Sequence, residues 1–289
     1  DVSRQMMRIA MMNLVLHGMQ EAAVRRANTL SEQGGLTDDD LRRRYSVILS
    51  NPPFAGVLPD KSIRKDLPTS SKKSELLFLG AMMQSLAPGG RCAVVVPEGL
   101  LFGSTGAHME LRRRLLQDFD LQAVISLPAG VFRPYAGVKT GVLVFRRPPA
   151  TAPNDSRRTE KVWFYEVRAD GYDPDKITGG GRPETPDRND IPDLLRHWKL
   201  YKSSGFRSPP GPEANSSLPS GSKNPRCWWT PAAMIAENGY NLAASRYKPS
   251  ITEQAMDEDP VELIREVLEI EQEIVEGLGR LLQEVDAAG

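Results

Sequence analysis

The pattern of hydrophobic and polar positions over residues 1–168 predicts strands that alternate with helices. Short apolar runs bounded by turn residues predict buried strands, whereas longer runs with apolar positions three and four residues apart predict helices. The predicted strands are residues 47–50, 91–97, 121–128, 140–147 and 161–167. The predicted helices are residues 3–19, 74–90 and 107–118. Strands alternating with helices are typical of βαβ units, so we expect an α/β fold with a doubly wound, mainly parallel sheet.

Three of these elements carry a more specific expectation. Residues 3–19 have apolar side chains on nearly every face, which favours a helix buried against the sheet. The run Val-Ile-Leu-Ser at 47–50 is continuous, as in a parallel strand that is buried on both faces. The last two predicted strands, 140–147 and 161–167, are expected to pair as a hairpin at the end of the sheet.

The pattern divides the chain into an α/β domain at residues 1–168 and two further regions. Residues 169–226 are rich in Gly, Pro and Ser and are predicted to be an irregular, mobile linker. Residues 227–289 are predicted to be helical. Apolar residues in their last part alternate in steps of three and four, which predicts a seam that packs on a helix of a partner protein. The alternative is a surface helix that packs on its own domain. The seam consists of Val261, Ile264, Leu268, Val275, Leu278, Leu282 and Val285.

Composition then limits the class of protein. The chain has 289 residues, is 40% hydrophobic, and balances 37 Lys and Arg against 37 Asp and Glu. A neutral chain is not built to hold nucleic acid by charge alone. The arginine run 112–114 could contact phosphates, although solvated helix faces are commoner. Cys92 and Cys227 lack the spacing of a metal site. The mostly apolar stretch at residues 6–19 is too short, and too often interrupted by polar residues, to span a bilayer. We expect a cytoplasmic protein without a metal.

The stretch Tyr-Ser-Val-Ile-Leu-Ser-Asn-Pro-Pro-Phe at 45–54 carries the candidate chemistry. Pro52 and Pro53 end the strand, so the chain turns at the carboxyl edge of the sheet, where α/β proteins bind ligands. The Asn51 side-chain oxygen and the Pro52 carbonyl could accept both hydrogens of an exocyclic amine and free its lone pair for attack. Phe54 could stack on a base that has left the helix. On these four residues alone, an ordinary turn with a packed Phe is the alternative.

Longer blocks give the motif a context. The sequence Asn-Pro-Pro-Phe resembles the catalytic motif of amino-group DNA methyltransferases of the N6-adenine type. Seven blocks, which occur in the family's order along nearly the whole chain, resemble the modification subunit of type I restriction–modification systems. These blocks are residues 8–19, 27–30, 46–56, 75–103, 123–145, 161–172 and 238–247.

The resemblance implies a fold, a reaction and partners. It implies a Rossmann-like class I methyltransferase sheet that binds S-adenosylmethionine and methylates N6 of an adenine flipped out of double-stranded DNA. The methyl group would move by direct in-line displacement, without a covalent enzyme intermediate. A specificity subunit would read the DNA sequence, and a restriction subunit could join the complex.

The resemblance also assigns roles to individual residues. Asn51, Pro52 and Phe54 take the roles argued above. Asn28 lies where the family places a side chain near the cofactor's adenine, and Asp1 is the candidate for the acidic residue at the ribose. Phe132 and Tyr135 are candidates for the second wall of the flipped-base site, with ordinary packing as the alternative in each case. Glu98 and Lys139 lie in loops at strand ends, and the resemblance gives neither a role.

One departure from the family's pattern leaves alternatives open. The family's glycine-rich cofactor loop should precede residue 1, and no such turn follows a strand in residues 1–50. We therefore expect the methyltransferase domain to be partial, with the target-amine half but not most of the cofactor half. The alternative function is an assembly module that only binds the specificity subunit. A methyltransferase of protein glutamine is a third reading, but that family usually has Tyr where this chain has Phe54.

Removing residues 259–289 is expected to abolish co-purification with the specificity subunit, because the apolar seam would supply the helix-to-helix contact. The measurement is affinity co-purification of the two proteins after co-expression. Unchanged co-purification of the shortened chain would contradict the docking hypothesis.

Overall fold

The computed structural model describes residues 1–249 apart from residues 55, 70, 152–158, 179–180 and 204–224, together with residues 268, 271, 272 and 275. Residues Asp1–Pro249 form one compact unit and Ser250–Gly289 form another. Most of the predicted apolar seam lies outside the described residues, as does the Ser- and Pro-rich stretch 204–224.

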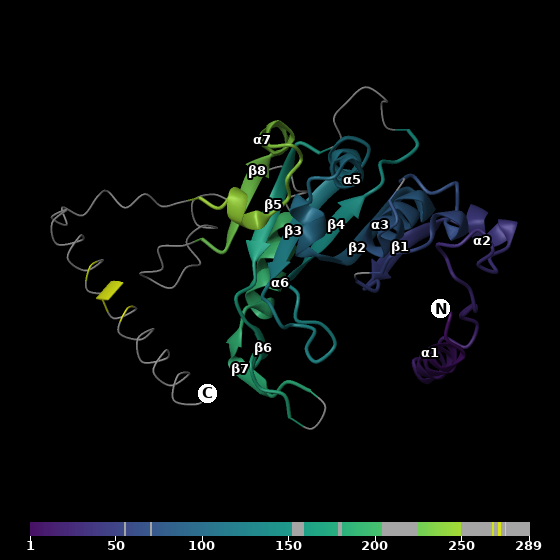
Figure 1. The fold of residues 1–289 in the computed structure, drawn as a ribbon, viewed down its shortest axis with the longest axis horizontal. Helices are drawn as coiled ribbons and strands as arrows, with labels where there is room; N and C mark the ends of the chain where they lie inside the picture. The colour runs from purple at the N-terminus through teal and green to yellow at the C-terminus, as the bar shows by residue number, and fades with distance from the viewer. Residues whose placement is uncertain are drawn as a thin grey trace, which may run out of the picture. The chain divides into compact units, whose positions relative to one another are not determined.

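A six-stranded mixed sheet forms the centre of the first unit, in the order β1-β2-β4-β3-β5-β8 (Figure 1). Strands β1, β2, β3 and β5 run in one direction, because β1 pairs parallel with β2 and β3 pairs parallel with β5. Strands β4 and β8 are antiparallel to their neighbours. The predicted α/β class is confirmed. The strands are β1 (Tyr45–Ser50), β2 (Leu86–Pro97), β3 (Asp120–Leu127), β4 (Thr140–Arg146), β5 (Lys161–Glu166) and β8 (Cys227–Pro231).

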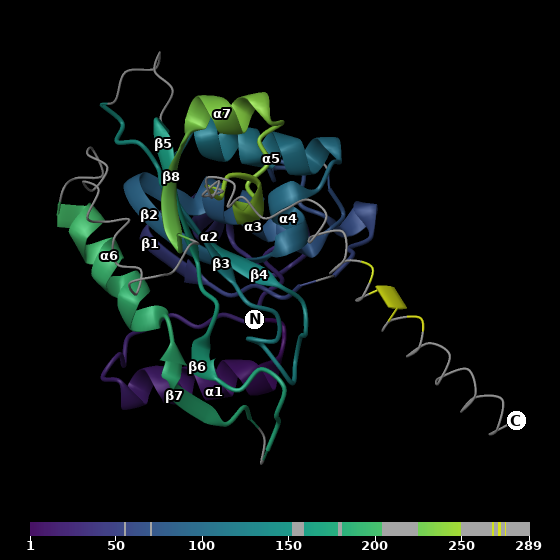
Figure 2. The same cartoon turned by 90° about the vertical axis from the view of Figure 1, so that its left-hand side faces the viewer.

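Helices lie on both faces of the sheet. Figure 2 shows α3, α4, α5 and α7 on one face and α6 on the other. A separate two-stranded hairpin consists of β6 (Asp170–Tyr172) and β7 (Glu184–Asn189). The helices are α1 (Arg4–Leu16), α2 (Asp38–Arg42), α3 (Ser74–Ser85), α4 (Glu98–Phe102), α5 (Gly106–Gln117), α6 (Ile191–Ser203) and α7 (Ala232–Glu237). Short 3-10 turns lie at η1 (Asp60–Ser62) and η3 (Ala244–Arg246).

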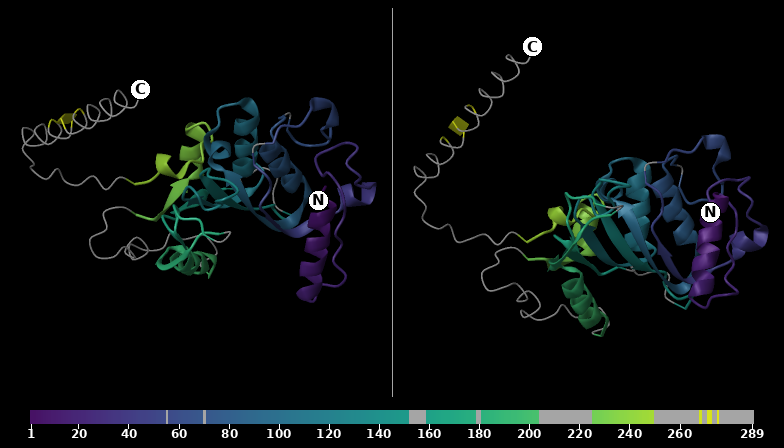
Figure 3. Two further views of the ribbon diagram at one scale, coloured as in Figure 1. Left: turned by 60° about the horizontal axis from the view of Figure 1, so that its bottom comes forward. Right: turned by 90° about the horizontal axis from the view of Figure 1, so that it is seen from below.

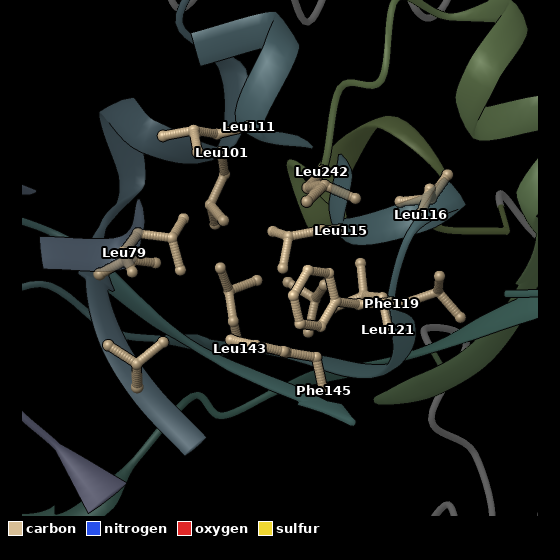
Figure 4. Close-up of a cluster of buried hydrophobic side chains, with 14 of the residues drawn as sticks. Leu79, Leu101, Leu111, Leu115, Leu116, Phe119, Leu121, Leu143, Phe145 and Leu242 are labelled. Carbon is tan, nitrogen blue, oxygen red and sulfur yellow. The ribbon is translucent and has the colours of Figure 1, made fainter. Parts of the chain in front are cut away.

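The main core lies between the sheet and the α3–α5 layer, as Figure 4 shows. Alternation along β4 directs Leu143 and Phe145 into this core, where both are fully buried. Leu111 and Leu115, four residues apart on α5, cover them from the helix side. The ring of Phe119 packs edge to face on Phe145 with centroids 5.6 Å apart.

A second core lies on the opposite face, under α6. Strand β5 is buried on both faces: Val162 and Phe164 belong to the main core, and Trp163 and Tyr165 to the second. The ring of Tyr201, on α6, packs edge to face on Trp163 with centroids 4.8 Å apart. Both layers therefore hold β5 in place.

Three predictions about strand pairing and secondary structure were wrong. Residues 140–147 and 161–167 do not form a hairpin, because β4 lies between β2 and β3 while β5 pairs with β3 and β8. Residues 227–231, predicted to belong to a helical region, form β8. Within residues 169–226, predicted to be an irregular, mobile linker, the structure contains β6, β7 and α6. The Gly and Pro residues of this region hide the helical spacing of Leu194, Trp198 and Tyr201, which pack on the sheet.

The predicted burial of 3–19 and 47–50 was also wrong. Helix α1 forms, but none of its residues is buried. In β1, Leu49 is 78% exposed and Val47 is 42% exposed. Strand β1 is the end strand of the sheet, with a partner only on its β2 side, and the faces that carry Val47 and Leu49 are left largely uncovered. Figure 3 shows α1, in purple, at this end of the sheet.

The contrast between two leucines gives a test of this arrangement. Leu143→Ala is expected to lower the free energy of unfolding by about 2–5 kcal/mol, because it leaves a cavity in the main core. Leu49→Ala, on the exposed end strand, is expected to change it by less than about 0.5 kcal/mol. Urea unfolding of the two variants measures both values. Equal losses of stability would contradict the assignment of β1 as an uncovered end strand.

Candidate functional site

The strand ends meet at one edge of the sheet. Strand β1 ends at Ser50, β2 at Pro97 and β3 at Leu127, all running the same way. Thr140, the first residue of β4, pairs with both Pro97 and Leu127. The segments that follow β1, β2 and β3 and the segment that precedes β4 are therefore neighbours at this edge, which is the usual ligand edge of α/β sheets.

The segment Asn51–Phe54 leaves β1 at this edge. The two prolines cannot continue a strand ladder, and the residues from Asn51 to Pro53 have no regular secondary structure. Pro52 is buried, Phe54 is half-buried and Asn51 is exposed. Among the described residues Asn51 has no hydrogen-bond partner for its side chain. The buried proline thus fixes the backbone while the amide stays accessible to a ligand.

Phe132 lies beside Phe54. Their ring centroids are 6.0 Å apart and their planes are inclined by 73°, an edge-to-face contact. Phe132 belongs to the loop 128–139 between β3 and β4. The structure therefore brings together two of the aromatic residues proposed for the flipped base. Tyr135, the third, is 92% exposed and stands apart from this contact.

An ion pair between Glu98 and Lys139 links the start of α4 to the end of the loop that carries Phe132. The Lys139 ammonium is 2.8 Å from a Glu98 carboxylate oxygen, and the Glu98 N–H donates to the Lys139 carbonyl at 2.9 Å. Glu98 begins α4 directly after β2, and Lys139 ends the Phe132 loop directly before β4. Sequence reasoning noticed both residues but missed their pairing, since their separation along the chain gives no periodic signal.

The two candidate cofactor residues lie on neighbouring segments. The Asp1 carbonyl accepts a hydrogen bond from the Ala27 N–H at 3.0 Å, next to Asn28. The side-chain oxygen of Asn28 already accepts the Leu30 N–H at 3.2 Å, within the turn that Asn28 opens. The Asp1 carboxylate accepts the Ser3 N–H at 2.7 Å. Both side chains are thus used in local turns.

Cavities flank β1 on both faces of the sheet. One, of about 500 Å³, is lined by Asp1, Ala27 and Thr29 on one side and by β1 from Tyr45 to Ser50 on the other. The second, of about 740 Å³, lies on the α6 side and shares the lining residues at 47–49. The first cavity is also lined by Phe78, Ala81 and Met82 of α3, and it follows β1 from Tyr45 to Ser50 rather than lying only at the strand end.

The residues present do not by themselves fit S-adenosylmethionine. A cofactor of this size needs a close backbone approach from a glycine turn that follows a strand, as in nucleotide-binding α/β folds. The described residues on the Asp1 side of the cavity have no such turn. Gly34 is enclosed instead by its own turn, where an added Cβ would lie 1.9 Å from the Asn28 carbonyl oxygen.

The other reactive groups do not form a competing site. Burial raises the pKa of the Cys92 thiol to about 12 and also raises the pKa of Cys227, so neither is a reactive thiolate. Burial lowers the pKa of His108, whose ring is bonded to the Thr105 hydroxyl at 2.6 Å. Within the described ranges no group of three His, Cys, Asp or Glu side chains could hold a metal ion. Nor does any described helix have the length and apolarity needed to cross a membrane.

Comparison with known proteins gives a family match. Residues 1–256 match the family of N-6 DNA methylases. The chain is 36% identical over 157 residues to the type I restriction enzyme EcoEI methylase subunit of Escherichia coli, covering 53% of this chain and 29% of that protein. It is 37% identical over 169 residues to the EcoKI methylase subunit of Escherichia coli strain K12, covering 56% and 30%. The matches thus span less than a third of these curated relatives.

Solved structures show the same fold. A chain from a structure of the assembly and conformational transition of a type I restriction–modification system aligns with a TM-score of 0.62 and 29% identity, covering 97% of this chain and 52% of that one. The type I restriction enzyme EcoKI M protein aligns with a TM-score of 0.62 and 24% identity, covering 99% and 59%. Each of these solved chains therefore contains much polypeptide that this chain does not match.

Proposed function

This chain belongs to the N-6 DNA methylase family, and we propose that it supplies the target-adenine half of a DNA adenine-N6 methyltransferase in a type I restriction–modification complex. The observation that carries the proposal is the exposed Asn51 amide, which the buried Pro52 holds at the ligand edge of the sheet. The similarity to type I methylase subunits supports the choice of complex.

The proposed chemistry uses two hydrogen-bond acceptors, on Asn51 and Pro52, and the aromatic ring of Phe54. The lone pair of an exocyclic amine is delocalised into its base, so the amine is a poor nucleophile. The Asn51 side-chain oxygen and the Pro52 carbonyl oxygen accept the two amine hydrogens and favour a tetrahedral nitrogen with a free lone pair. Phe54 offers a ring for stacking a base that has left the duplex. No tuned general base is needed, because the methylated ammonium can lose its proton to water.

The partners follow from the same proposal. The substrate is double-stranded DNA with one adenine flipped out, and the chain's neutral charge leaves most of the DNA binding to other subunits. A specificity subunit reads the DNA sequence, and a restriction subunit can join the assembly. Asn28 and Asp1 remain the candidates for cofactor contacts, next to whatever polypeptide completes the site.

We infer the position of that polypeptide from the open end of the sheet. A strand added beside β1 would place alternate side chains into the two flanking cavities, which meet at Val47, Ile48 and Leu49. We propose that a strand of the cofactor-binding portion occupies this position. The continuous apolar run of β1 is typical of a strand covered on both faces, whereas in this chain Leu49 is 78% exposed. The two solved chains compared above contain polypeptide that this chain does not match and that could supply this cover. Without that portion the chain would act as an assembly module, which is the alternative function.

The chain alone is expected to bind S-adenosylmethionine too weakly to measure, because the cofactor side of β1 is open. Isothermal titration calorimetry of S-adenosylmethionine into the chain tests this. A chain extended by the cofactor-binding portion of a type I methylase subunit serves as the positive control. Tight binding by the chain alone would contradict the proposed division of the site.

In a complete complex, Asn51→Ala is expected to lower the methylation rate by a factor of about 100 or more, since it removes one preorganised acceptor. Asn51→Asp keeps an oxygen in place and is expected to retain part of the activity. Transfer of labelled methyl to DNA measures both, and cofactor affinity should stay unchanged in each. An Asn51→Ala complex with full activity would rule out this mechanism.

A further inference from the structure

The hairpin β6–β7 contacts the loop that carries Phe132. This hairpin extends from the carboxyl end of β5, and its base is held by Asp190. The Asp190 carboxylate accepts the N–H groups of Arg168 and Ala169 at 2.8 and 3.1 Å. Sequence reasoning predicted this region to be an irregular linker, so it gave the hairpin no part in the site.

Arg182 in this hairpin uses every N–H of its guanidinium. Two N–H groups form a bidentate pair with the Asp170 carboxylate at 2.6 and 2.7 Å. The remaining donations go to backbone carbonyls: to Asp173 at 3.0 Å, to Tyr172 at 2.9 Å, and to Val131 at 3.2 Å. The Arg182 side chain is only 6% exposed and that of Asp170 only 11%. A pair this enclosed is far less screened by water than a surface ion pair.

The bond to Val131 crosses from the hairpin to the neighbour of Phe132. A second bond crosses in the opposite direction, from the Arg133 guanidinium in the loop to the Pro174 carbonyl in the hairpin at 2.9 Å. The first contact holds the backbone carbonyl before Phe132, and the second holds the side chain of the residue after it. Phe132 is the residue whose ring packs on Phe54.

We propose that Arg182, held by Asp170, is a positioning residue that fixes Phe132 beside Phe54 and so shapes the site for the flipped adenine. The inference rests on the proposed function, because it assigns a task to that same site. Lysine cannot replace this arginine, since one ammonium cannot reproduce a planar fork with five donors. Glutamine removes the charge and most of the donors while keeping the stem.

The test compares Arg182→Gln and Arg182→Lys with Arg196→Gln, in the complete modification complex. Arg196 is the matched control because it also forms a 2.6 Å pair with a carboxylate, that of Asp193, but its side chain is 59% exposed. Base flipping is followed on a DNA probe in which 2-aminopurine replaces the target adenine, because 2-aminopurine fluorescence rises when the base leaves the stack. The kcat/KM is measured on the same DNA with adenine, since 2-aminopurine lacks the N6 amine. Hydrogen exchange of residues 131–136 reports on the loop in the same proteins.

Both Arg182 variants are expected to exchange faster at 131–136 and to show a smaller rise in 2-aminopurine fluorescence. The kcat/KM for DNA should fall about 10- to 100-fold, which is about 1.4–2.8 kcal/mol at 1.4 kcal/mol per tenfold change, because a charged hydrogen bond is lost. Affinity for S-adenosylmethionine should not change, and Arg196→Gln should match the wild type in every readout. Should Arg182→Gln not fold, Arg182→Lys keeps the charge and carries the test.

Two outcomes would overturn the inference. One is a folded Arg182 variant with wild-type base flipping and wild-type kcat/KM. The other is equal loss of cofactor affinity and DNA turnover, which would mean a general loss of structure. Failure of the proposed function looks different: the wild-type complex itself would neither flip nor methylate adenine. In that case unchanged hydrogen exchange in the Arg182 variants would still refute the bracing of the loop.

Discussion

The antiparallel insertion of β4 between β2 and β3 is the constraint on which the site depends. Because β4 runs against both neighbours, the loop from β3 to β4 must start and finish at the same edge at which β1 and β2 end. That loop carries Phe132, and the end of β1 carries Phe54. The pairing of β4 with β2 and β3 thus brings Phe54 and Phe132 into contact although they are far apart in the sequence. The buried Leu143 and Phe145 keep β4 in its register.

Local patterns in the sequence predict five of the six strands of the central sheet, the helices α1, α3 and α5, and the candidate motif, but not β8, β6, β7 or α6. The strand at 47–50 and the helix at 107–118 follow directly from apolar spacing and turn residues, as does the break at Pro52. Strand order cannot be obtained in this way, because it depends on pairing between distant segments. The expected hairpin of β4 with β5 failed for that reason. The Arg182 network was invisible too, since its acceptors are carbonyls and a carboxylate in a region that looked irregular.

Charge runs were a weaker guide than apolar runs. The arginines at 112–114 suggested phosphate contact, but successive residues on a helix point about 100° apart. Arg112 therefore faces the interior, where it donates to the carbonyls of Leu100 and Tyr240 and is 2% exposed. Burial lowers its pKa. Its neighbours pair with Glu110 on the surface and hold the pKa of that carboxyl at about 2. The sequence alone does not show which arginine of the run is buried and which ones lie on the surface.

The contact between Phe54 and Phe132 limits how an adenine could enter the proposed site. Separating the rings to sandwich a base would forfeit an edge-to-face contact worth about 0.5–1.5 kcal/mol, while stacking on an aromatic ring returns about 1–3 kcal/mol. The exchange is favourable only if Phe132 can move at little cost, and the Arg182 and Arg133 contacts oppose such movement. Stacking on the open face of Phe54, with Phe132 as a fixed side wall, needs no separation. The second face of the base would then need another residue, and the 92% exposed Tyr135 is the remaining aromatic of this loop.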